Sequence, residues 1–249
     1  MKKGEKAMKK VFISADIEGI AFAATWESTH PGGHDYERCR QEMTNEVLAA
    51  AEGAHEAGAE LVVVKDAHGP GTSIYPEQMP EYVQLIRGWQ FEPKCMVEGI
   101  DETFDAAMFV GYHNCAGAEG NALRHTIAGG VVQRILVNGE EASEFLIYSW
   151  MAAYYGVPSV LLTGDKTLCE RGRAYHPELV TVAAKDDQGG HVLCRSPRLV
   201  CDEIREAAKQ ALRQARAYFW VRALCPDKSC GSFSRASARL AFWDICCRW

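Results

Sequence analysis

Two carboxylates and a glycine end the first apolar run of the chain. Residues 11–13 lead through Ser14 and Ala15 into Asp16, Glu18 and Gly19. Side chains alternate between the two faces of a strand, so Asp16 and Glu18 lie on the same side if the strand continues through them. Neighbouring anions repel each other, and a divalent metal ion is the simplest source of compensating charge. This segment therefore predicts a metal site.

Metal-binding residue types also follow later apolar runs: Asp66 and His68 after residues 61–64, His113 after residues 106–112, and Asp165 after residues 159–163. Carboxylates and imidazoles are the ligands of hydrolytic zinc sites. Taken singly, each residue has an ordinary structural explanation as a helix cap or a turn former, and Asp66 could instead orient His68. Ligands of open α/β sheets bind beyond the carboxyl ends of the strands, where these residues would meet.

Strand-like and helix-like patterns alternate along the chain and must position these residues. Apolar runs predict strands at residues 10–15, 61–64, 106–112, 131–137, 159–163 and 179–184. Three- and four-residue periodicity predicts helices at residues 35–58, 143–155 and 197–216, and a Gly/Pro-rich loop is expected at 68–80. This order predicts an α/β fold: a mostly parallel central sheet flanked by helices, with the metal site at the carboxyl ends of the strands.

Composition narrows the classes of partner. A chain of 249 residues with 47% hydrophobic content can form one large α/β domain or two modest ones. The net charge of −6 gives no reason to expect nucleic-acid binding. No uninterrupted apolar segment reaches the roughly 18 residues of a membrane helix. Since no signal-peptide pattern follows the lysine-rich start, we expect a cytoplasmic protein with reduced cysteines.

Six short motifs occur in a fixed order between about Met8 and about Ala215: Ser14-x-Asp16-x-Glu18-Gly19, Asp66-Ala67-His68-Gly69, Gly111-Tyr112-His113, His125-Thr126, Asn138-Gly139 followed by Glu144, and Thr163-Gly164-Asp165. This ordered set resembles the motifs of the DppA-type zinc-dependent D-aminopeptidases. The resemblance implies two zinc ions per subunit, a short peptide substrate that begins with a D-residue such as D-alanine, and a ring-shaped homo-oligomer.

The same resemblance assigns roles to individual residues. It places the zinc ligands at Asp16, Glu18, His68, His113 and Glu144, with Asp16 bridging both ions. Glu144 would otherwise be interpreted as a favourable charge in the first turn of a helix. His125 corresponds to an active-site histidine not bound to metal, which could protonate the departing amine or stabilise an oxyanion. Direct nucleophilic attack by His125 ranks below attack by a metal-activated water. The other five histidines have no comparable placement.

The chain divides into a leader at residues 1–7, an α/β metallopeptidase domain at 8–216 and an atypical tail at 217–249. The tail mixes Trp, Cys and Arg without a clear period. A frameshift or a lineage-specific extension would each produce such a segment, and we favour the frameshift.

Two other functions compete with the peptidase. A phosphatase could hold magnesium at Asp16 and Glu18, but the chain has no Gly-rich phosphate cradle with a Lys and a Ser or Thr. A non-catalytic peptide-binding relative could keep the fold, but such a relative would usually have lost one of the expected ligands.

Overall fold

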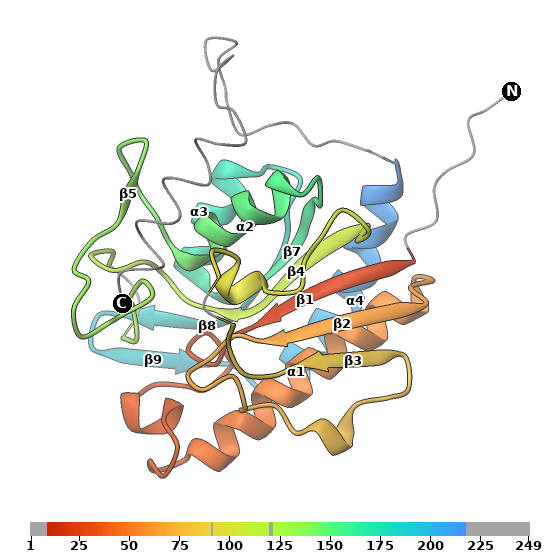
Figure 1. The fold of residues 1–249 in the computed structure, drawn as a ribbon. Coiled ribbons are helices and arrows are strands. Elements are labelled where there is room, and N and C mark those ends of the chain that lie inside the picture. The colour runs from red at the N-terminus through yellow and green to blue at the C-terminus, as the bar shows by residue number, and fades with distance from the viewer. Residues whose placement is uncertain (1–8, 91, 120–121, 218–249) are drawn as a thin grey trace, which may run out of the picture.

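A seven-stranded sheet forms the centre of the molecule in the computed structural model, which describes residues 9–90, 92–119 and 122–217 (Figure 1). The strand order is β3-β2-β1-β4-β7-β8-β9. The strands are β1 (Lys10–Ala15), β2 (Leu61–Asp66), β3 (Val83–Ile86), β4 (Ala106–Tyr112), β7 (Ser159–Asp165), β8 (Val180–Gln188) and β9 (His191–Cys194). All neighbours pair in parallel except β8 and β9. The predicted α/β fold class is confirmed.

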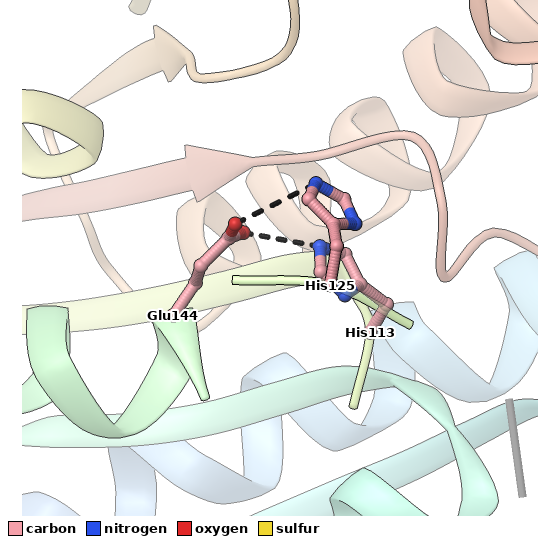
Figure 2. A group of neighbouring side chains, drawn as sticks. All are labelled: His113, His125 and Glu144. Atoms are coloured by element: carbon pink, nitrogen blue, oxygen red, sulfur yellow. Dashed lines mark hydrogen bonds and ion pairs between the residues drawn. The ribbon is translucent and has the colours of Figure 1, made fainter. Parts of the chain in front are cut away.

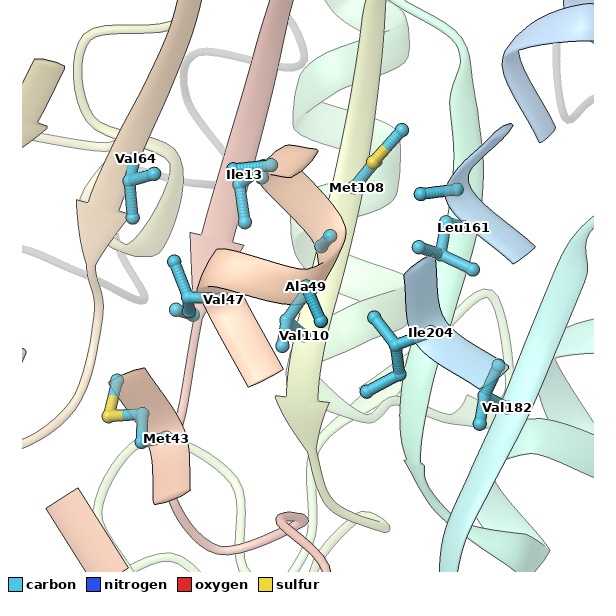
Figure 3. Packing of buried hydrophobic residues seen from close by; sticks show 14 of the residues in the cluster. Ile13, Met43, Val47, Ala49, Val64, Met108, Val110, Leu161, Val182 and Ile204 are labelled. Carbon is cyan, nitrogen blue, oxygen red and sulfur yellow. The ribbon is translucent and has the colours of Figure 1, made fainter. Parts of the chain in front are cut away.

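Helices cover both faces of this sheet because its strands are apolar on both sides. Helices α1 (Tyr36–Glu56) and α4 (Pro197–Ala217) pack on one face, and α2 (Glu144–Tyr154) and α3 (Lys166–Tyr175) pack on the other. Figure 3 shows the first of these cores, where Val47 and Ile204 from the two helices pack beside Ile13 and Met108 of the sheet. Phe12, which alternates with Ile13, belongs to the opposite core.

The prediction of a strand at residues 131–137 is wrong. Only β5 (Leu136–Val137) is extended, and it pairs with β6 (Glu140–Glu141) in a separate two-stranded ribbon. Asn138 and Gly139 form the turn with φ values of 54° and 86°, a conformation that suits an Asn-Gly hairpin. Val131 is 61% exposed, whereas Ile135 and Val137 are partly buried against the core on the α2 face, so the run contributes to the core only at its end.

Short elements account for the remaining differences from the sequence prediction. Strand β3, strand β9 and helix α3 were not predicted, and neither were the 3-10 helices η1 (Trp26–Thr29), η2 (Pro76–Gln78) and η3 (Cys95–Val97). The predicted leader and residues 218–249 of the predicted tail lie outside the described residues. Within the described part of the chain, no helix is both long enough and apolar enough to cross a membrane.

Candidate metal centre

Six side chains meet at the carboxyl ends of β1, β2 and β4. They are the residues that the sequence singled out: Asp16, Glu18, His68, His113, His125 and Glu144. All except His113 line a cavity of about 810 Å³. Their metal-binding atoms form two groups of three, and the atoms within each group lie within 4.8 Å of one another. The position agrees with the edge at which ligands of parallel sheets are expected.

The first group consists of Asp16, Glu18 and His68, all buried. His68 Nδ1 lies 3.3 Å from Asp16 Oδ1 and 3.1 Å from Glu18 Oε2. The other ring nitrogen, Nε2, donates a hydrogen bond to the carbonyl of Thr29 at 2.6 Å. Because that bond occupies Nε2, Nδ1 is the nitrogen that faces the carboxylates.

The second group consists of His113, His125 and Glu144 (Figure 2). Glu144 Oε2 lies 3.1 Å from His113 Nε2, and Glu144 Oε1 lies 3.7 Å from His125 Nε2. Each histidine donates through Nδ1 to a backbone carbonyl, His113 to Asn114 at 2.9 Å and His125 to Leu123 at 3.0 Å. Both Nε2 atoms are therefore available to the site.

Local structure fixes Glu144 at the first turn of α2. Ser143 caps the helix, since its Oγ accepts a hydrogen bond from the amide of Leu146 at 3.1 Å. The amide of Ile127 donates to Glu144 Oε1 at 2.6 Å. Ile127 has a φ of 65°, which is rare for a β-branched residue, so the segment after His125 holds a strained conformation that directs this amide at the carboxylate.

Asp16 lies between the two groups. Its Oδ1 faces His68, and its Oδ2 lies 3.4 Å from His113 Nε2. Oδ2 is buried and makes no hydrogen bond with any described residue. A buried carboxylate oxygen without a hydrogen bond is costly unless a cation neutralises it. The oxygen and nitrogen donors suit divalent zinc, and the carboxylate is placed to contact ions in both groups.

Close packing of the backbone brings Asp16 and His113 together. The amide of Gly19 donates to the carbonyl of Gly111 at 2.8 Å, so the segment after β1 lies directly against the end of β4. A Cβ atom at Gly19 would lie 1.9 Å from the carbonyl oxygen of Tyr112. Gly111 has a φ of 72°, and a Cβ there would lie 2.2 Å from the carbonyl oxygen of Asp16. Both glycines are required by this approach.

The charges of the centre shift its pKa values strongly. Burial and the charge of Glu18 raise the pKa of Asp16 to about 8. Burial would lower the pKa of His113, but the charge of Glu144 outweighs it and raises this pKa to about 10. The pKa of His68 is also raised against the effect of burial, chiefly by Glu18. Without metal, protons on the two imidazoles thus supply the positive charge that the carboxylates need.

Two candidates from the sequence have structural roles instead. Asp66 accepts hydrogen bonds from the backbone amides of Ile74 at 2.7 Å and His68 at 3.5 Å, which fixes the loop after β2. Asp66 thus holds His68 through its backbone amide, and the carbonyl of Thr29 fixes the orientation of its imidazole. Asp165 caps α3 by accepting from the amide of Leu168 at 2.8 Å.

Sequence reasoning missed the walls of the cavity. They include Trp26 and His30 from the segment of η1, and Trp89, Cys95 and Tyr148 from other elements. The sequence pattern gave no site role to His30. Of these residues only Tyr148 lies in a predicted helix, and the others lie in segments without a periodic pattern. The signal available in the sequence was the residue type of Trp26, because large aromatic side chains are uncommon in exposed loops. In the structure, Trp26 is 42% exposed.

Comparisons with known proteins identify the family of the chain. The family model of peptidase M55, described as D-aminopeptidase, matches residues 8–230. A D-aminopeptidase of Bacillus subtilis is 31% identical over 189 residues, which cover 76% of this chain and 68% of the relative.

A solved structure, described as "Zn-dependent D-aminopeptidase DppA from Bacillus subtilis, a self-compartmentalizing protease", is 30% identical, with a TM-score of 0.78. The match covers 82% of this chain and 74% of that one. The resemblance inferred from the six motifs is confirmed, and the chain belongs to the peptidase M55 family of D-aminopeptidases.

Proposed function

We propose that this chain is a zinc-dependent aminopeptidase that hydrolyses the N-terminal peptide bond of short peptides beginning with a D-residue, such as D-alanine. The family match and the Zn-dependent relative support the reaction and the metal. The observation that carries the proposal is Asp16, whose two oxygens face the two donor groups. This arrangement supports two zinc ions per subunit, with Asp16 between them.

The ligands divide between the two positions. Glu18 and His68 would hold one ion, His113 and Glu144 the other, and Asp16 would contact both. When bound, the zinc ions supply Lewis acidity, which polarises the scissile carbonyl and makes hydroxide available near neutral pH. The carbonyls of Thr29 and Asn114 fix which nitrogen of His68 and His113 is directed at the ions.

We assign His125 to proton transfer rather than to zinc binding. The rings of His113 and His125 stack with centroids 4.0 Å apart and an interplanar angle of 11°. Nitrogen lone pairs lie in the ring planes, so two nearly parallel rings cannot both direct a lone pair at one ion. The His125 side chain is 14% exposed, whereas that of His113 is fully buried. His125 Nε2 is therefore placed to exchange a proton with a substrate in the cavity, such as the departing amine.

The assembly and the location of the protein are further parts of the proposal. The related solved structure is described as a self-compartmentalizing protease, which supports a homo-oligomer with a ring-shaped arrangement for this chain. The six cysteines of the described region are free thiols, in keeping with a cytoplasmic location.

The test combines metal analysis with a stereochemical assay. The purified protein should contain about two zinc ions per chain and release D-alanine from D-Ala-D-Ala faster than it releases L-alanine from L-Ala-L-Ala. A chelator should abolish the activity and added zinc should restore it. Cleavage of the L-peptide alone would contradict the substrate assignment. Hydrolysis of p-nitrophenyl phosphate without peptide cleavage would favour the phosphatase.

A further inference from the structure

A buried lysine lies behind the first donor group. Lys185 is on β8, and its side chain is fully buried. Its ammonium donates hydrogen bonds to the carbonyl of Glu18 at 2.6 Å and to the carbonyl of Ala23 at 2.5 Å. These two carbonyls begin and end the segment 18–23, which carries the ligand Glu18 away from β1. One ammonium thus holds both ends of that segment.

Lys185 also forms a buried ion pair. Asp187 Oδ2 lies 3.8 Å from its ammonium and makes no hydrogen bond with any described residue. Asp187 instead uses Oδ1 to accept from the amide of Ala122 at 3.3 Å. Burial of an ammonium is unfavourable, and an apolar side chain of similar volume is often tolerated better at such a place. The two hydrogen bonds to the segment 18–23, at 2.6 and 2.5 Å, are shorter than the contact with Asp187, so the ammonium mainly holds this segment.

A second buried side chain holds the same segment. Glu46 of α1 is fully buried, and its Oε1 accepts a hydrogen bond from the amide of Ala21 at 2.9 Å. The segment 18–23 is therefore held at its carbonyls by a cation and at a central amide by a carboxylate. Both contacts involve only backbone atoms of the segment, so they fix its path without occupying the ligand atoms of Glu18.

We propose that Lys185 is a positioning residue that sets the zinc affinity of the group formed by Asp16, Glu18 and His68. This inference rests on the zinc site of the proposed function. Lys185 reaches Glu18 through its backbone and makes no contact with His113 or Glu144 in the described structure. Loss of its ammonium should therefore weaken the binding of one ion and leave the binding of the other close to that of the unmodified protein.

Lys65 offers a matched control. It is also a fully buried lysine of the sheet, on β2, and its ammonium also donates to two carbonyls, those of Asp66 at 2.5 Å and Gly88 at 2.8 Å. It lies 3.9 Å from the ring centroid of Trp89 and does not contact the segment 18–23. Lys65→Met thus removes a buried ammonium of the same kind; it releases the carbonyl of Asp66, two residues before His68, and leaves both bonds to the segment 18–23 in place.

The experiment measures the two stepwise zinc dissociation constants by competition with a chromophoric chelator. In Lys185→Met, one constant should rise by about 10–100-fold, as for the loss of a residue that orients a ligand. Lys185→Gln keeps hydrogen-bond donors without the charge and should give an intermediate value. Lys65→Met should change either constant by less than Lys185→Met does, because it does not release Glu18. Cobalt substitution provides a second readout, because the visible absorption of only one of two ions should change.

Several results would overturn the inference: unchanged constants in Lys185→Met, an equal rise in both constants, the same rise in Lys65→Met, or failure of both Lys185 variants to fold while Lys65→Met folds. Each would make Lys185 a general stability residue or an irrelevant one. Absence of zinc from the unmodified protein would instead contradict the proposed function itself, so the two failures are distinguishable.

Discussion

The two donor groups are built in different ways. The first comes from two adjacent parallel strands, since Ala15 of β1 pairs with Asp66 of β2; Asp16 follows Ala15 directly, and His68 comes two residues after Asp66. The second assembles from the end of β4, the segment around His125 and the first turn of α2. Strand pairing thus places the first group, whereas the second depends on contacts between segments that are not neighbours in the sheet.

This difference has a consequence for rigidity. The sheet constrains the first group through a continuous hydrogen-bond ladder, and Lys185 fixes the one segment that leaves it. Glu144 is instead held by a helix cap and by the amide of Ile127. Changes to the cap and the amide that hold Glu144 should therefore have graded effects on the second group.

The largest effect should follow from Asp16→Ala, because the two oxygens of Asp16 face both groups. Removal of its carboxylate leaves His68 and His113 without the anion between them. We expect loss of both zinc ions and a fall in kcat/KM beyond the roughly 10²–10⁴-fold typical of a lost proton donor. Zinc analysis after gel filtration and a D-Ala-D-Ala assay measure the two effects. Asp16→Asn preserves the volume and is the control for packing. Retention of full activity in Asp16→Ala would refute the dinuclear site.

A comparison of His125→Ala with His113→Ala tests the division within the second group. His113→Ala should lower the zinc content to about one ion per chain, because its Nε2 faces Glu144 and Asp16. His125→Ala should keep the zinc and lower kcat by about 10²–10⁴-fold, with little change in KM. Zinc analysis and steady-state kinetics separate the two outcomes. A loss of zinc in His125→Ala would make His125 a ligand and contradict its proposed role.

Zinc binding should also depend on pH. As the pH rises, the affinity for zinc should increase and the stability of the zinc-free protein should decrease. His113, with its pKa raised to about 10 against burial by the charge of Glu144, must lose a proton to bind zinc. Affinity should therefore rise by about tenfold per pH unit for each displaced proton. The stability that this protonation gives the zinc-free fold is fully present below the ordinary pKa of 6.5 and is lost as pH rises toward about 10.

Chelator competition from pH 6 to pH 9 and thermal unfolding of the zinc-free protein check these two trends. The variant His113→Gln should have a smaller pH slope for zinc affinity than the unmodified protein. A zinc affinity that does not change with pH would contradict the protonation of His113 in the zinc-free state.

The same difference between the two groups explains what the sequence could predict. Asp16, Glu18, His68 and His113 each follow a strand closely, so an apolar run and a sheet edge were enough to place them together. Glu144 lies at the first turn of a helix, where a carboxylate is ordinarily favourable without any ligand. Only the family resemblance identified it, since its role depends on Ile127 and His113, which are distant in the sequence. The strand predicted at residues 131–137 was wrong because an apolar pattern does not show whether a segment has a partner strand, and this segment pairs with no strand of the central sheet.

The smallest effect should come from Ser143→Ala, which tests the graded behaviour of the second group. Loss of the cap should lower the free energy of unfolding by about 1 kcal/mol. It should also weaken the binding of one zinc ion slightly, because the first turn of α2 carries Glu144. Ser149→Ala is the control: Ser149 is a buried serine of the same helix that donates to the carbonyl of Leu146 at 2.9 Å, so its loss removes a hydroxyl and leaves the N-cap in place. Urea unfolding and chelator competition measure both quantities. If Ser143→Ala and Ser149→Ala had the same zinc affinity, the cap would stabilise the helix without positioning the ligand, and Glu144 would be held by the Ile127 amide alone.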